Sequence, residues 1–134
     1  METMNHEHYV SLEVAKQLKE AGFDWQCKAL YKQNGDFILR DYDRDWNATA
    51  SVNPNVEYYS APTLNITQKW LREVKGWEAQ VAYGFDKDGH KIYATECGNP
   101  KGDIENYIVY FSTYEEALEA CINKALEIIL EKGE

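Results

Sequence analysis

The chain has 134 residues, of which 44% are hydrophobic and 28% charged, and these shares exclude a disordered chain. Its 23 acidic and 14 basic residues give a formal net charge of -9, which opposes non-specific attraction to a nucleic-acid backbone. The length predicts a single domain over residues 1–134, with a flexible N-terminus at residues 1–8.

The first predicted helix spans residues 11–21, where apolar side chains recur at helical spacing. Ser11 is a typical N-cap residue, because its hydroxyl can accept a hydrogen bond from a free backbone N–H of the first turn. Gly22 follows the last periodic residue and is expected to end the helix.

A hairpin and then a long loop are expected after this helix. Residues 29–32 and 36–40 have strand-like composition and flank Asn34 and Gly35, a pair typical of a two-residue hairpin turn. Residues 41–59 mix Asp, Asn, Ser and Pro with aromatic side chains and have no sustained period. They predict a long loop, and loops of this length are usually functional or mobile.

The second predicted helix follows Pro62, with Thr63 as its cap and Gly76 as its stop. The residues on the opposite side from its core face are polar and mostly basic. At 100° per residue, one apolar arc is expected to face the core and contains Ile66, Thr67, Trp70, Leu71 and Val74.

Three strands of an antiparallel meander come next, at residues 77–85, 91–97 and about 106–111. A polar turn at residues 86–89 joins the first two. The first strand alternates in the manner of a half-buried strand, so one set of side chains is expected to face the core: Trp77, Ala79, Val81, Tyr83 and Phe85.

The last predicted helix begins at a capping box made by Thr113 and Glu116, and its apolar residues follow helical spacing. Together the elements predict an α+β fold. Three amphipathic helices are expected to pack on the antiparallel β-meander, and a short hairpin occupies the N-terminal half.

The cellular setting is predicted from cysteine usage and hydropathy. Cys27, Cys97 and Cys121 are odd in number and widely spaced, which favours reduced thiols over a disulfide framework. No apolar run approaches the roughly 20 residues of a membrane-spanning helix, and residues 1–8 do not resemble a signal peptide. We therefore predict a cytoplasmic protein without membrane contact.

Two acidic segments partly match a calcium-binding loop, whose alternating carboxylates converge on a hard cation. Loops begun at Asp41 or at Asp86 would place Trp46 or Lys91 where the template requires glycine. The histidines of residues 1–8 lie in a segment expected to be flexible. The sequence therefore predicts no metal site.

Nucleophilic catalysis would need a thiol or hydroxyl beside a base, and His90 with Cys97 is the one pairing that the predicted meander suggests. A third, orienting group is missing from the pattern. Gly98 and Gly102 bracket a segment that matches neither a phosphate-binding loop nor a dinucleotide fingerprint. The interpretation leans toward a non-enzyme without a cofactor.

The second helix carries the most informative polar surface, with Lys69, Arg72 and Lys75 on one side. The simpler interpretation is an ordinary solvated helix face. The alternative is a partner-binding surface, in which Tyr58 and Tyr59 act as hot-spot or stacking residues beside the three cations.

Three segments carry a resemblance, namely Tyr9–Phe23, Ser60–Glu73 and Thr113–Ala120. In order and spacing the chain resembles a group of small uncharacterised proteins of phages, prophages and mobile elements, especially of gut bacteria. The resemblance covers most of the chain and rests mainly on helix signatures. The resemblance implies an origin in a phage or mobile element and a compact fold, and it identifies no functional residue.

Two classes of function remain. The first is a non-enzymatic accessory or interaction domain with an unidentified protein partner and its working surface within residues 41–75. The second is a nucleic-acid-related protein, either a binder through the basic helix face or an acidic DNA mimic, although the net charge disfavours direct binding. The sequence leaves the oligomeric state open.

Overall fold

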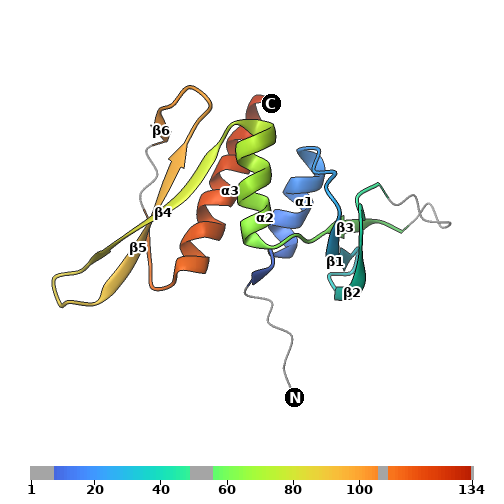
Figure 1. Ribbon diagram of the computed structural model, residues 1–134, viewed down its shortest axis with the longest axis horizontal. Coiled ribbons are helices and arrows are strands. Elements are labelled where there is room, and N and C mark those ends of the chain that lie inside the picture. Colours follow the sequence, from blue (N-terminus) through green and yellow to red (C-terminus); the bar gives the residue numbers. More distant parts are fainter. Residues whose placement is uncertain (1–7, 49–55, 106–108, 134) are drawn as a thin grey trace, which may run out of the picture. The chain divides into compact units, whose positions relative to one another are not determined.

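The computed structural model describes residues 8–48, 56–105 and 109–133. The fold is α+β, as predicted, with antiparallel pairing in both sheets. The chain divides into two compact units, residues 1–63 and 64–134, each with its own sheet (Figure 1). The single domain expected from the length stays a prediction, and the two units are described in turn. No helix in the described ranges is long and apolar enough to cross a membrane.

The first unit contains helix α1 (Leu12–Glu20) and a three-stranded sheet with the order β2-β1-β3. Ser11 caps α1, since its Oγ accepts a hydrogen bond of 3.3 Å from the N–H of Val14. Gly22 follows the helix with a φ of +97°, a conformation that glycine adopts at low cost. Both ends of the first predicted helix are confirmed. The strands are β1 (Cys27–Lys32), β2 (Phe37–Arg44) and β3 (Tyr58–Ser60).

The β1–β2 turn differs in detail from the two-residue turn expected around Asn34 and Gly35. The N–H of Gly35 donates to the carbonyl of Lys32, and the N–H of Lys32 donates to the carbonyl of Asp36, both at 2.8 Å. Only Gly35 has a positive φ, so the turn lacks the two left-handed residues that a two-residue turn of type I′ needs. The hairpin closes through a three-residue turn with glycine at its last position.

The loop predicted over residues 41–59 is shorter in the structure, because strands extend into it from both ends. Strand β2 continues to Arg44 and β3 begins at Tyr58, because both pair with β1 across an antiparallel ladder. Trp46 is buried with Cys27 and Leu30 in the core of this unit. Residues 49–55 lie outside the described ranges, as do residues 1–7 of the predicted flexible N-terminus.

The second unit begins with α2 (Leu64–Trp70) and a π-helical segment, η2 (Leu71–Lys75). The N–H of Gly76 donates to the carbonyl of Leu71, a five-residue step that widens the last turn. The wider turn moves Val74 outward, to 51% exposure, and leaves Lys75 half-buried. The predicted apolar arc is correct at Thr67, Trp70 and Leu71, which are buried, and wrong at Val74 and at Ile66, which is 39% exposed.

The meander consists of β4 (Glu78–Phe85) and β5 (Lys91–Gly98), followed by β6 (Ile104–Glu105) and β7 (Tyr110–Phe111). Strand β5 pairs with β4 on one side, and with β6 and β7 on the other. The predicted third strand at residues 106–111 is described only in part, because residues 106–108 lie outside the described ranges.

Helix α3 (Tyr114–Lys132) packs against β4 and β5. Thr113 caps it as predicted, with the N–H of Glu116 donating to the Thr113 Oγ1 over 3.2 Å. The apolar side of α3 supplies much of the core of the second unit: Ala117, Leu118, Cys121, Ile122, Ala125, Leu126 and Ile129.

Candidate functional site

The outer end of the β4–β5 hairpin carries large aromatic side chains in water. Tyr83 is 68% exposed and Phe85 is 65% exposed, the two highest values among the large hydrophobic residues described. Because side chains of directly paired residues point to the same face of a sheet, they share a face with their β5 partners, Tyr93 and Lys91. We call Val81, Tyr83, Phe85, Lys91 and Tyr93 the hairpin face.

The hairpin face continues the core face of the sheet beyond the reach of α3. Ala79 and its partner Cys97 lie on the same face and are buried against the helix. Helix α3 begins at Tyr114, whose ring meets that of Tyr93 edge-on with centroids 6.2 Å apart. The hairpin extends past this end of α3, and Figure 1 shows the turn well beyond the helix. Tyr83 and Phe85, predicted to face the core, are therefore exposed.

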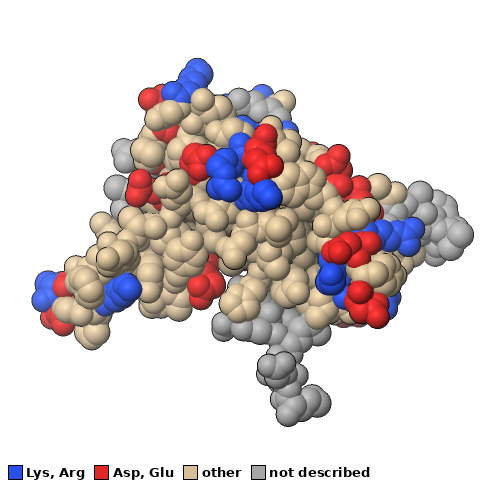
Figure 2. Space-filling model, viewed as in Figure 1, with Lys and Arg blue, Asp and Glu red and all other residues tan. Residues whose placement is uncertain are grey.

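Lys91 lies over two aromatic rings of the hairpin face, those of Tyr83 and Tyr93. Its Nζ lies 4.6 Å from the ring centroid of Tyr83 and 5.6 Å from that of Tyr93. Both distances fall within the range of a cation–π attraction. In Figure 2 charged atoms gather at the tip of the hairpin, whereas the surface along it is largely uncharged. The arrangement is an ordered apolar surface with one central cation.

The hairpin turn brings three potential metal ligands together. Asp86, Asp88 and His90 place carboxylate oxygens and an imidazole nitrogen within 4.8 Å of one another. Asp86 Oδ1 also accepts the N–H groups of Asp88 and His90, both at 2.9 Å, and so it closes the turn. His90 Nδ1 lies 3.4 Å from Asp86 Oδ2. A divalent cation would have to compete with these contacts at an exposed position.

The pairing of His90 with Cys97 is not assembled in the structure. His90 directly precedes β5 and Cys97 lies near the other end of the strand, so seven strand steps separate them by roughly 23 Å. Cys97 instead lies in the core, where its Sγ donates to the carbonyl of Cys121 over 3.3 Å. The contact with the Cys121 thiol, followed by burial, raises the pKa of Cys97. Such a thiol stays protonated and is a poor nucleophile at neutral pH.

We expect the three thiols of the native protein to react slowly with Ellman's reagent at pH 8. All three are buried, and burial also raises the pKa of Cys27. In 6 M guanidinium all three should react at the rate of free cysteine. The substitution His90→Ala should leave the native rate unchanged. A thiol that reacts rapidly at pH 6, and loses this reactivity in His90→Ala, would contradict the conclusion that His90 activates none of the three cysteines.

The basic residues of the second helix are partly neutralised. Lys69 Nζ lies 3.9 Å from a carboxylate oxygen of Glu73, and Arg72 Nη1 lies 3.9 Å from one of Glu78. Lys75 places its Nζ 5.8 Å from the ring centroid of Trp70. Figure 2 accordingly shows basic and acidic atoms side by side over α2. The helix presents a mixed surface rather than a cationic one.

Tyr58 and Tyr59 belong to the first unit and point to opposite faces of β3, as successive strand residues do. Tyr58 packs against the core cluster that contains Trp46. Tyr59 lies beneath Lys16 and Lys19 of α1, whose Nζ atoms are 5.6 and 5.2 Å from its ring centroid. Partial burial, followed by the charge of Glu57, raises the pKa of Tyr59. Trp46 itself is buried in the core of the first unit.

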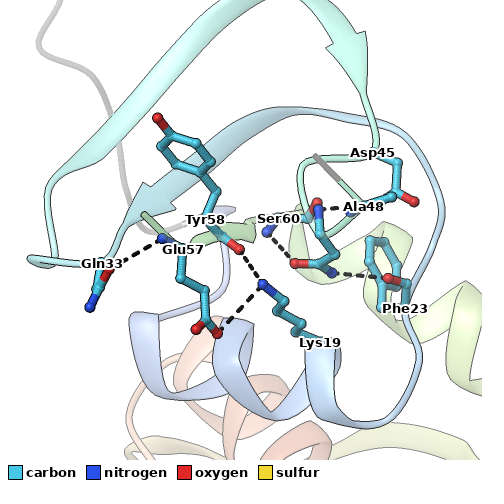
Figure 3. Close-up of polar contacts among 9 residues, drawn as sticks. Lys19, Phe23, Gln33, Asp45, Ala48, Glu57, Tyr58 and Ser60 are labelled. Carbon is cyan, nitrogen blue, oxygen red and sulfur yellow. Dashed lines mark hydrogen bonds and ion pairs between the residues drawn. The ribbon is translucent and has the colours of Figure 1, made fainter. Parts of the chain in front are cut away.

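A polar network anchors β3 in this unit. Lys19 Nζ donates to the carbonyl of Tyr58 over 3.0 Å and lies 3.5 Å from the Glu57 carboxylate (Figure 3). Asn47 accepts from the N–H of Ser60 and donates to the carbonyl of Phe23, at 2.9 Å each. These contacts tie β3 to α1 and to the residues around it. The polar groups thus serve the fold of the unit.

Sequence reasoning missed Tyr83 and Phe85 as surface residues. Strand alternation correctly identified their common face, but it cannot say how far along the strand a helix covers that face. One signal was available. Phe85 directly precedes the polar turn 86–89, and the returning strand begins with Lys91. Phe85 therefore has a charged residue, and not an apolar one, opposite it in the hairpin.

No family model, curated protein or solved structure matches the chain. The resemblance to proteins of phages and mobile elements therefore stays a prediction.

Proposed function

We propose that this chain is a non-enzymatic accessory domain that binds a protein partner through the hairpin face. The exposure of Tyr83 and Phe85 carries the proposal. Aromatic side chains dominate the binding energy of protein interfaces when a partner removes them from water. Here they stand on a regular two-stranded ladder, so little conformational entropy is lost when they are covered.

The reactive groups of the described residues support a binding role over catalysis. Cys97 is buried and protonated, and His90 lies at the other end of the strand. A cytoplasmic setting is part of the proposal, because three unpaired cysteines suit a reducing compartment.

The surface suggested by Tyr58, Tyr59, Lys69, Arg72 and Lys75 stays a prediction. The ion pairs of Lys69 and Arg72 reduce the cationic character that an acidic partner or a nucleic acid would need. The nucleic-acid alternative thus gains no support from these residues, and the hairpin face is the stronger candidate.

Site-specific photo-crosslinking tests the proposal. A photoreactive phenylalanine analogue at position 85 should form covalent protein adducts in cells that express the full chain. The matched control carries the analogue at Tyr110, which is 62% exposed and points to the opposite face of the same sheet. Adducts at position 85 should vanish when Tyr83→Ser is added. The absence of adducts at position 85, or equal adducts at both positions, would overturn the proposal.

A further inference from the structure

Strand β4 is the edge of its sheet. Among the described residues it pairs with β5 alone. The carbonyl of Ala79 accepts a hydrogen bond of 2.6 Å from Gln68 Nε2 of α2, so it points away from β5. The N–H of Asp86 donates to the carbonyl of His90 over 2.9 Å. The backbone N–H and C=O groups of the even-numbered residues of β4 therefore point toward β5. Backbone direction alternates along a strand, so the N–H and C=O groups of the odd-numbered residues Val81, Tyr83 and Phe85 point outward.

The outward edge lacks the usual protection against pairing with another strand. Natural edge strands carry charged residues, especially lysine, or proline or a bulge. Residues 79–85 contain neither a charge nor a proline, and their ladder with β5 is regular from Glu78 to Phe85. Lys91 belongs to β5 and lies over the ring of Tyr83, so it does not occupy the edge. The same three residues that offer free backbone groups also carry the apolar side chains of the hairpin face.

We infer that this edge pairs with the β4 edge of a second copy of the chain, an inference that rests on the proposed function and names its partner. The pairing is antiparallel and two-fold symmetric about Tyr83. Tyr83 then lies opposite Tyr83 of the partner, and Val81 lies opposite the partner's Phe85. Each such pair exchanges two backbone hydrogen bonds, and the sheet continues across both copies.

The sequence of the edge is compatible with this register and disfavours a shift toward the start of β4. Between positions 80 and 86 no like charges meet, since Gln80 lies opposite the partner's Asp86. The antiparallel register centred on Ala82 would place Glu78 opposite the partner's Asp86. It would also place Ala79 opposite the partner's Phe85, although the Ala79 carbonyl already accepts a hydrogen bond from Gln68. The register centred on Tyr83 avoids both costs and joins two apolar stripes of the same kind.

The charge of the chain gives the dimer a distinctive salt dependence. Each copy carries a formal net charge of -9, so two copies repel each other at low ionic strength. Salt screens this repulsion and should strengthen the dimer. A basic partner at the same site would show the opposite trend, with binding weakened by salt.

Sedimentation equilibrium of the full chain tests the inference. The measured mass should rise from 15.5 kDa toward twice that value as protein or salt concentration increases. Tyr83→Lys, which sets two lysines face to face, should keep the protein monomeric at least tenfold above the wild-type midpoint. Tyr110→Lys, a matched change at 62% exposure on the other face, should dimerise like the wild type. Circular dichroism should show that both variants fold.

Cysteine crosslinking tests the register independently. Opposed residues of a hydrogen-bonded pair have Cα atoms about 5.5 Å apart, a distance that a disulfide can bridge. Oxidised Tyr83→Cys should therefore migrate as a covalent dimer, and Tyr110→Cys should not. A wild-type mass of one chain at all concentrations and salts, or equal effects of the two lysine variants, would overturn the self-pairing. If position 85 nevertheless crosslinks to a different protein, the proposed function stands, and if it crosslinks to nothing, both fail.

Discussion

Replacing Trp46 with alanine is expected to destabilise the first unit by about 3–5 kcal/mol, the usual cost of truncating a buried tryptophan. Trp46 is 6% exposed and packs with Cys27 and Leu30. Its Nε1 donates to the carbonyl of Cys27 over 2.8 Å, so the substitution removes both packing and a buried hydrogen bond. Urea unfolding followed by circular dichroism measures the loss, and hydrogen exchange locates it in residues 12–44.

Two further variants separate the contributions at this position. Trp46→Phe keeps much of the ring packing but leaves the Cys27 carbonyl without its donor, at a cost of about 1–3 kcal/mol. Trp25→Ala is the control, because Trp25 is half-buried and lies outside the cluster. If Trp25→Ala cost as much as Trp46→Ala, the role of Trp46 as the core residue of this unit would be wrong.

The second large effect is expected in the second unit, where Leu126→Ala should cost about 2–5 kcal/mol. Leu126 lies fully buried on the core side of α3, so truncation leaves a cavity that the neighbouring helix turns cannot fill. Leu130→Ala is a matched control, since it changes the same residue type one turn later at a half-buried position. The difference in urea midpoint between the two variants is the measurement, and equal midpoints would contradict the burial pattern.

Leaving the hairpin face in water has an energetic consequence. A fully buried aromatic side chain is worth about 1.5–3 kcal/mol relative to an exposed one. Tyr83 and Phe85 forgo most of this gain in the isolated chain. A second strand at the β4 edge would recover part of it, and would also satisfy the outward backbone groups. The side-chain burial and the backbone hydrogen bonds both involve Val81, Tyr83 and Phe85. One substitution at Tyr83 is therefore expected to affect both contributions.

The helix ends were predictable because they are local. Ser11 and Thr113 cap α1 and α3 through hydroxyls that reach backbone groups only three residues away. The β4–β5 hairpin was likewise predictable, since a polar turn separates two strands with period-two alternation. Such signals require no knowledge of distant parts of the chain.

Three features could not be read from local pattern. The π-helical turn at Leu71–Lys75 rotates Val74 out of the apolar arc that a regular helix would give it. The role of Trp46 depends on β3, because the N–H of Trp46 donates to Ser60 Oγ across 14 residues of chain. The hairpin face was not among the predicted site residues, because exposed aromatic side chains were sought in the irregular segment before α2.

The α+β class, the helix caps and the strand alternation could all be predicted from local pattern, since each depends on propensity and spacing over a few residues. Which apolar residues are covered depends on the packing of distant elements. Ala79 and Tyr83 occupy equivalent positions on one face of β4, yet the first is 1% exposed and the second 68%. The difference arises because α3 begins at Tyr114 and covers only part of the sheet. The burial of a strand residue depends on which element packs over it and not on the apolar pattern of the strand.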